Sequence, residues 1–96
     1  MFARKGDDLY VAREIAYSEA MLGGEVEIPI LEGNTILLTV PQATESGKVL
    51  RISGKGIPHF GGYGRGNIYV ELIIKTPKKI SREQKKLLEQ LKKEGL

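Results

Sequence analysis

The sequence predicts a mostly β protein: a small antiparallel β-sandwich with one short helix and a C-terminal helix. Three observations predict this fold class. Short segments with alternating apolar and polar residues recur along most of the 96 residues, which is typical of half-buried strands. Glycine, proline and asparagine separate these segments and mark turns. The final residues instead place leucines at helical spacing.

The first strand is expected over residues 9–17, where apolar side chains recur at every second position. Arg13 interrupts the apolar face, so the strand should lie at an edge or point partly to water. Ser18 is a candidate N-cap for a short helical turn over residues 19–22, which Gly23 would end.

Two further strands, over residues 25–30 and 35–40, should form a hairpin, because Glu32-Gly33-Asn34 is a tight turn between them. After a loop over residues 41–47, another strand is expected over residues 48–53. A last strand begins at residue 68. Its inward face should carry Ile68, Val70, Leu72 and Ile74, with Ile73 on the outer face.

Six of the twelve glycines fall between Gly54 and Gly66. This density indicates positive φ or close backbone approach at several points, and Gly64 and Gly66 are candidates for positive φ. Apolar residues stand among the glycines, so we expect an ordered loop whose apolar side chains are covered, with Tyr63 packed or hydrogen-bonded.

A helix is expected over residues 82–94. Ser81 and Gln84 match a capping box, and Gly95 would end the helix. Leu87, Leu88 and Leu91 form one apolar stripe. A helix of this length is marginal alone in water, so it should pack either on its own domain or on a partner subunit. The residues by themselves leave these two alternatives open.

Composition excludes several classes of protein. The apolar fraction of 41% and the charged fraction of 28% are typical of a folded globular domain. No apolar run approaches the roughly 20 residues that cross a bilayer, so no membrane association is expected. The chain has no cysteine, which removes disulfides and thiolate metal sites. Together with the lack of a secretory signal, this predicts a cytoplasmic location.

The net charge of +3 is concentrated near the C-terminus. Residues 1–77 hold eight Lys/Arg and nine Asp/Glu, whereas residues 78–96 hold seven Lys/Arg and three Asp/Glu. A nucleic-acid surface usually spreads its cations over a face of the fold. The basic tail therefore favours a solvated helix face, although a nucleic-acid-binding β domain with a basic tail stays the alternative function.

No catalytic constellation is present in the sequence. His59 is the only histidine and is expected to be a surface or packing residue, because it has no partner that would complete a metal site. The glycines match neither the phosphate-binding loop nor the dinucleotide fingerprint. Their spacing differs from both motifs, and the residues after them are expected to form a strand, whereas both motifs lead into a helix. We therefore expect no enzyme activity, no cofactor and no metal; a hydrolase or transferase has no supporting residues.

Several motifs, in order, carry a family resemblance. The central ones are Gly54-Lys55-Gly56-Ile57-Pro58, then Gly64-Arg65-Gly66-Asn67-Ile68, a strand, Pro77 and a helix. The N-terminal ones are Phe2, Arg4, Gly6, the run from Asp8 to Val11, Ile15, Ala20, Leu22-Gly23 and the run from Val26 to Pro29. Nearly the whole chain thereby resembles the second carboxy-terminal β domain of DnaJ-type co-chaperones.

This resemblance implies two small sheets, a short helix, and a terminal helix that projects toward a second subunit. It divides the chain into a β-sandwich client or interaction domain (residues 1–77) and a C-terminal dimerisation helix (residues 78–96). The chain lacks the His-Pro-Asp motif of a J domain and the Cys-x-x-Cys repeats of a zinc module. It is therefore expected to be a fragment that neither stimulates an ATPase nor refolds clients alone.

The implied function is that of a non-enzymatic module for protein folding and the stress response. It would form a homodimer and help hold unfolded polypeptide clients for a DnaK-type chaperone, which it would reach through the full-length protein; no nucleic acid is expected. The dimer interface is expected at Leu87, Leu88, Leu91 and Leu96. A client-binding surface is expected at Ile57, Phe60, Tyr63, Tyr69 and Ile73, although the same side chains could simply complete the core.

Overall fold

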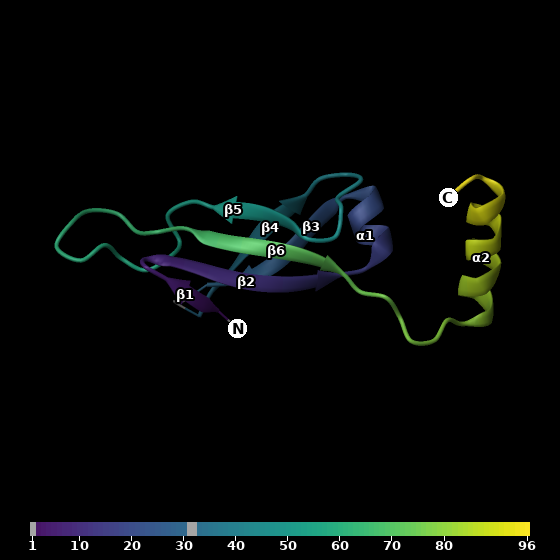
Figure 1. Ribbon diagram of the computed structural model, residues 1–96, viewed down its shortest axis with the longest axis horizontal. Helices are drawn as coiled ribbons and strands as arrows, with labels where there is room; N and C mark the ends of the chain where they lie inside the picture. Colours follow the sequence, from purple (N-terminus) through teal and green to yellow (C-terminus); the bar gives the residue numbers. More distant parts are fainter. Residues whose placement is uncertain (1, 31–32) are drawn as a thin grey trace.

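The computed structural model describes residues 2–30 and 33–96. Two sheets pack face to face in a mostly β body, with a short helix beside them (Figure 1). One sheet has four strands in the order β1-β2-β6-β5, and the other is the β3-β4 hairpin. The strands are β1 (Ala3–Lys5), β2 (Asp8–Ile15), β3 (Gly24–Pro29), β4 (Thr35–Val40), β5 (Lys48–Ile52) and β6 (Ile68–Ile74). The helices are α1 (Tyr17–Leu22) and α2 (Arg82–Lys93).

The predicted mostly β class with two helices is confirmed, but one pairing is not antiparallel. β2 pairs with β6 in parallel, with Tyr10 opposite Tyr69 and Ala12 opposite Glu71. The other described pairings are antiparallel, so the four-stranded sheet is mixed. A parallel pair requires a long crossover, and here the crossover carries α1, the β3-β4 hairpin and β5.

The core lies between the two sheets. Alternate residues of β2 and β6 point inward, as expected from their spacing, and Ile68, Val70 and Leu72 are fully buried at the centre. The hairpin covers this face through Val26 and Ile28 of β3. The expected hairpin between residues 25–30 and 35–40 is confirmed by its register. Of its predicted turn, Gly33 has a φ of +82°, while Glu32 lies outside the described residues.

α1 begins earlier than the sequence indicates. Its N-cap is Ala16, so Ser18 lies inside the helix and the predicted cap at Ser18 is wrong. The Glu19 carboxylate accepts a hydrogen bond from the Ala16 amide at 2.8 Å instead, which satisfies one donor at the helix start. Gly23 ends the helix as expected, with a φ of +79°. A Cβ there would lie 2.9 Å from the Val40 carbonyl oxygen.

α2 stands apart from the β body, at the end opposite the glycine-rich loop (Figure 1). None of its residues is buried, and the tether over residues 75–81 is exposed. The radius of gyration is 16.9 Å, whereas a compact chain of this length would have about 12.5 Å. The helix therefore adds length to the molecule, which extends 58 Å along its longest axis, and contributes nothing to the core.

Candidate interaction surfaces

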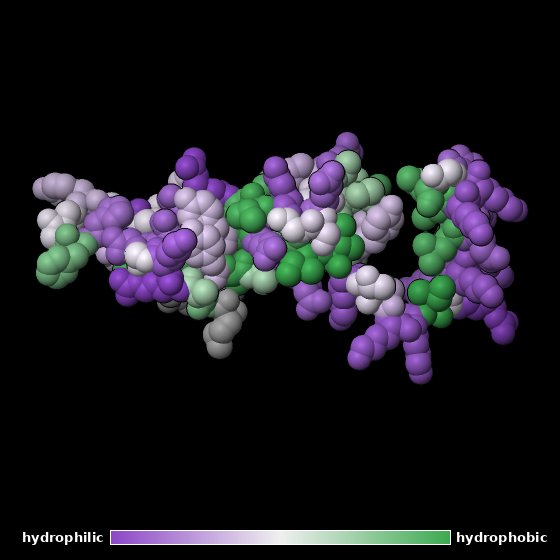
Figure 2. Space-filling view, viewed as in Figure 1, coloured by the Kyte–Doolittle hydropathy of each residue, from purple (hydrophilic) through white to green (hydrophobic). Residues whose placement is uncertain are grey.

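The first candidate surface is the leucine side of α2. Leu87, Leu88, Leu91 and Leu96 are 59%, 46%, 36% and 76% exposed. Figure 2 shows this apolar side turned toward the β body, with hydrophilic residues on the opposite side of the helix. The structure thus brings together the four residues predicted for a dimer interface on one helix and its cap, and leaves all of them accessible.

Capping interactions define both ends of α2. Ser81 Oγ accepts a hydrogen bond from the Gln84 amide at 3.1 Å, and Gln84 Oε1 accepts one from the Ser81 amide at 2.7 Å. At the other end, the amides of Gly95 and Leu96 donate to the carbonyls of Lys92 and Leu91, at 3.1 and 2.9 Å. This is a Schellman motif, for which Gly95 supplies the positive φ of +93°. The predicted capping box and glycine stop are both confirmed.

The second candidate surface is a shallow groove on the outer face of the four-stranded sheet, the face turned toward the viewer in Figures 1 and 2. Its volume is about 460 Å³. The rings of Tyr10 and Tyr69 stack beside it, with centroids 5.0 Å apart and planes inclined by 17°. The groove-lining residues are Ala3, Tyr10, Val11, Ala12, Val49, Tyr69 and Glu71.

The groove follows from the strand register. Tyr10 and Tyr69 are partners across β2 and β6, as are Ala12 and Glu71. Val49 of β5 lies opposite Glu71 from the other side. The side chains of Ala12 and Val49 beside the tyrosine stack are small, and the groove is the space that they do not fill. β5 is an edge strand in the described sheet, so an extended segment could also pair with its main chain.

The third candidate surface is the glycine-rich arm, the connection over residues 53–67. Its two sides pair with each other: the His59 amide donates to the Gly64 carbonyl at 3.0 Å and the Gly66 amide donates to the Ile57 carbonyl at 2.9 Å. At the tip, the side chains of Phe60 and Tyr63 are entirely exposed. The expectation that these side chains are covered is therefore wrong, although the loop is ordered by its own main chain.

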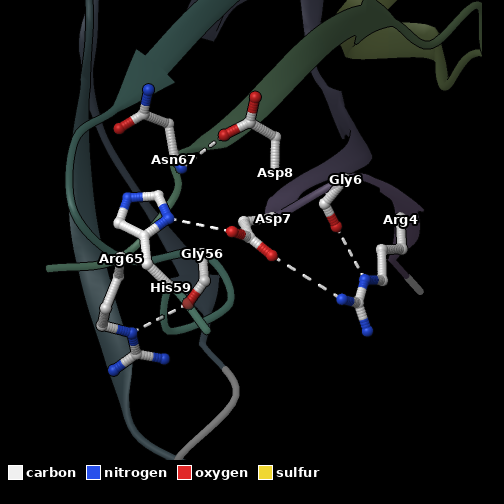
Figure 3. Close-up of polar contacts among 8 residues, drawn as sticks. All are labelled: Arg4, Gly6, Asp7, Asp8, Gly56, His59, Arg65 and Asn67. Atoms are coloured by element: carbon white, nitrogen blue, oxygen red, sulfur yellow. Dashed lines mark hydrogen bonds and ion pairs between the residues drawn. The ribbon is translucent and has the colours of Figure 1, made fainter. Parts of the chain in front are cut away.

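The β1–β2 turn holds the base of the arm in place (Figure 3). The Asp7 carbonyl accepts a hydrogen bond from the Ile57 amide at 2.8 Å. The Asp7 carboxylate lies 2.8 Å from His59 Nδ1 and 3.7 Å from the Arg4 guanidinium. His59 is thus a surface residue, as expected, and its partner is a carboxylate 52 positions away.

Two glycines allow this close approach. A Cβ on Gly66 would lie 2.0 Å from the Asp7 carbonyl oxygen, and one on Gly56 would lie 2.6 Å from it. Gly64 has the predicted positive φ, +81°, but Gly66 does not. Gly66 is therefore required for close backbone approach, one of the two reasons expected for these glycines, and the positive φ predicted for it is wrong.

The residues predicted for client binding lie in three places. Tyr69 and Ile73 are on the outer face, Phe60 and Tyr63 are at the tip of the arm, and Ile57 packs against the core. The structure does not bring these five together. Sequence reasoning missed Tyr10, Ala12, Val49 and Glu71, whose only signal was their outward position on strands; their common location depends on which strands pair.

No metal site or membrane span is found in the part of the chain that the structure describes. Across residues 2–30 and 33–96, no three His, Cys, Asp or Glu side chains gather closely enough to hold a metal ion. Among the same residues, no helix has both the length and the apolar character needed to cross a bilayer.

Comparison with known proteins identifies relatives over the whole fold. Residues 1–77 match the family model described as the DnaJ C terminal domain. The chain is 46% identical to Chaperone protein DnaJ of Leptospira biflexa over 95 residues, which is 99% of this chain and 25% of that protein. It is 52% identical to Chaperone protein DnaJ of Fusobacterium nucleatum subsp. polymorphum over 89 residues, or 93% and 22% of the two chains.

A third relative is Chaperone protein DnaJ 2 of Aquifex aeolicus, 44% identical over 97 residues, which covers 96% of this chain and 26% of the relative. The chain thus spans about a quarter of the length of these relatives. The family model covers the β body, and the pairwise matches continue into α2. The chain belongs to the DnaJ C-terminal domain family.

Proposed function

We propose that this chain is the dimerising part of a DnaJ-type co-chaperone and helps to hold non-native polypeptides for a DnaK-type chaperone. Residues 1–77 form the client or interaction domain, and residues 78–96 carry the dimerisation helix. The proposal has no catalytic step. Its two elements are an apolar helix side that requires a partner and a shallow groove that takes an extended chain.

The observation that carries the proposal is a fully capped α2 with no buried residue. A helix of 12 residues is marginal in water without tertiary packing, and its leucines are exposed to an extent that favours burial. A second copy offers an identical apolar side, so a two-fold pairing of α2 with α2 buries both at once. Leu87, Leu88 and Leu91 form the centre of this interface, with Leu96 at its end.

The groove beside Tyr10 and Tyr69 is the proposed client site. Main-chain pairing with the free edge of β5 supplies attraction that tolerates many client sequences, and the aromatic pair favours apolar side chains. Ile73 extends the same face along β6. Phe60 and Tyr63 form a separate second contact, because they lie at the tip of the arm rather than in the groove.

Two measurements test the proposal. Sedimentation equilibrium of the chain at several concentrations should give a mass that rises from monomer to dimer. A fluorescent peptide of extended apolar sequence should bind to the chain and shift the amide resonances of Tyr10 and Tyr69. Both results should change little between low and high salt, because apolar contacts dominate. A monomer at all concentrations contradicts the dimer, and unshifted tyrosine resonances contradict the client site.

Salt dependence also separates this function from nucleic-acid binding. Phosphate contacts release counterions, so affinity for a nucleic acid falls steeply as salt increases. The five cations Arg82, Lys85, Lys86, Lys92 and Lys93 lie on α2, and they are the residues that such binding would use. Tight, salt-sensitive binding of an RNA or DNA oligonucleotide, with no peptide binding, would replace the proposal by the alternative.

A further inference from the structure

One charged side chain lines the groove on the outer face. Glu71 is exposed and lies in the middle of β6, between Tyr69 and Ile73 on the same face. Within the ranges 2–30 and 33–96, its carboxylate has no hydrogen bond or ion pair. An unpaired carboxylate in the middle of an otherwise apolar groove is available to a charge on whatever binds there.

The strand register leaves room around this carboxylate. Ala12 is the partner of Glu71 on β2, and Val49 is its partner on β5. Both side chains are short, so neither covers the carboxylate. The tyrosine stack stands in the adjacent row, where Tyr10 and Tyr69 pair. A long side chain from a ligand could therefore lie along the rings and end at Glu71.

Other charged residues on this face lie close to the groove. Arg51 of β5 is the partner of Tyr69, and Glu14 of β2 is the partner of Ile73. Neither lines the groove. Lys5 of β1 and Asp8 of β2 are partners in the row beyond Tyr10, and neither lines the groove. Among the described residues, Glu71 is the charged residue that lines the hollow. The charge of the groove is therefore negative at its centre.

We propose that this groove selects extended polypeptide segments that carry a lysine or arginine between apolar side chains. The aliphatic stem of the basic residue lies on the rings of Tyr10 and Tyr69, and its charged end pairs with Glu71. Lys and Arg combine an apolar stem and a cationic head in this way, and an aromatic ring attracts the cation further. The inference rests on the proposed client site and adds the chemical class of its ligand.

The expected selectivity is moderate, because the groove is open to water. An exposed ion pair together with a cation–aromatic contact corresponds to about a three- to thirtyfold difference in affinity. The difference should shrink as salt increases, because an exposed pair is screened. Added salt should therefore reduce the preference for a basic residue, whereas the affinity for purely apolar segments should change little.

The test uses the 96-residue chain and three fluorescein-labelled nonapeptides that share one extended apolar sequence. The peptides differ only at the central residue, which is Lys, Gln or Glu, and their affinities are measured by fluorescence anisotropy. The Lys peptide should bind wild type about tenfold more tightly than the Glu peptide. Glu71→Gln should remove most of this preference, and Glu71→Lys should reverse it.

Glu14→Gln is the matched control, because it removes the same charge from the same face outside the groove and should keep the preference. Thermal melts establish that each variant folds. Equal binding of the Lys and Glu peptides to wild type, or an unchanged preference in Glu71→Lys, overturns this inference while the client site stands. A loss of preference in Glu14→Gln as large as that in Glu71→Gln also overturns it. If no peptide binds, both this inference and the proposed client site are wrong.

Discussion

Replacing Leu87 by Asp should separate the proposed dimer without unfolding the β body. The magnitude follows from the exposed area of the leucine side of α2. The exposed fractions of Leu87, Leu88, Leu91 and Leu96 together equal about two fully exposed leucine side chains, worth about 3–6 kcal/mol per copy on burial. Two copies would gain about 6–12 kcal/mol, against an association cost of at least about 4 kcal/mol.

The surplus is small, so the isolated chain should form a weak dimer, with Kd of about 1 µM or higher. Leu87 is 59% exposed, and burying that fraction contributes about 0.9–1.8 kcal/mol per copy. Losing this contribution from both copies weakens the dimer by about 2–4 kcal/mol, or about 30- to 700-fold in Kd. Burial of two aspartates adds to the loss, and Leu91→Asp should act in the same way.

Sedimentation equilibrium measures the mass, and the thermal melt of the β body reports its folding. The variant should sediment as a monomer at concentrations where wild type is a dimer, while the melting temperature of the body is unchanged. Lys93→Gln is the control, because it also changes the charge by one negative unit but lies on the side of α2 away from the leucines. Equal masses for wild type and Leu87→Asp would refute the role of α2, as would a drop in mass for Lys93→Gln.

Three further substitutions test local features. Gly66→Ala should destabilise the fold by more than about 2 kcal/mol in denaturant titrations, because its Cβ would clash with the Asp7 carbonyl; Gly62→Ala, whose Cβ has room, should stay within about 0.5 kcal/mol. Ser81→Ala should weaken the start of α2 by about 1 kcal/mol, seen as lower helicity by circular dichroism with an unchanged melt of the body. His59→Ala should speed hydrogen exchange at the base of the arm while global stability falls by less than about 1 kcal/mol; unchanged exchange would show that the contact with Asp7 does not hold the arm.

Local sequence patterns were sufficient to predict most helices and strands of the fold. The β3-β4 hairpin and the inward face of β6 follow from strict alternation, which specifies the buried side of a strand without knowledge of its partner. The start and end of α2 follow from Ser81, Gln84 and Gly95, because capping interactions join residues close in sequence. α1 is the exception, because the sequence assigned its N-cap to Ser18, whereas the N-cap is Ala16, two residues earlier.

Features that depend on distant strands could not be read from the sequence. The parallel pairing of β2 with β6 is set by the crossover that joins them, and no local pattern distinguishes it from an antiparallel pairing. The stack of Tyr10 on Tyr69, and hence the groove, depends on that pairing. Gly66 shows the same limit, since the backbone that excludes a side chain there belongs to Asp7, 59 positions earlier.

The two proposed interactions use separate residues, and this separation has a functional consequence. The buried apolar residues of the core all lie between residues 9 and 72. The docking of α2 on a second copy therefore does not require the sheets to change. No residue of α2 or its tether lines the groove, so pairing through α2 leaves both grooves of a dimer accessible. A client long enough to reach both would bind the second groove at an effective concentration in the millimolar range for a short span. Weak, sequence-tolerant grooves can thereby retain a long unfolded chain while releasing a short one.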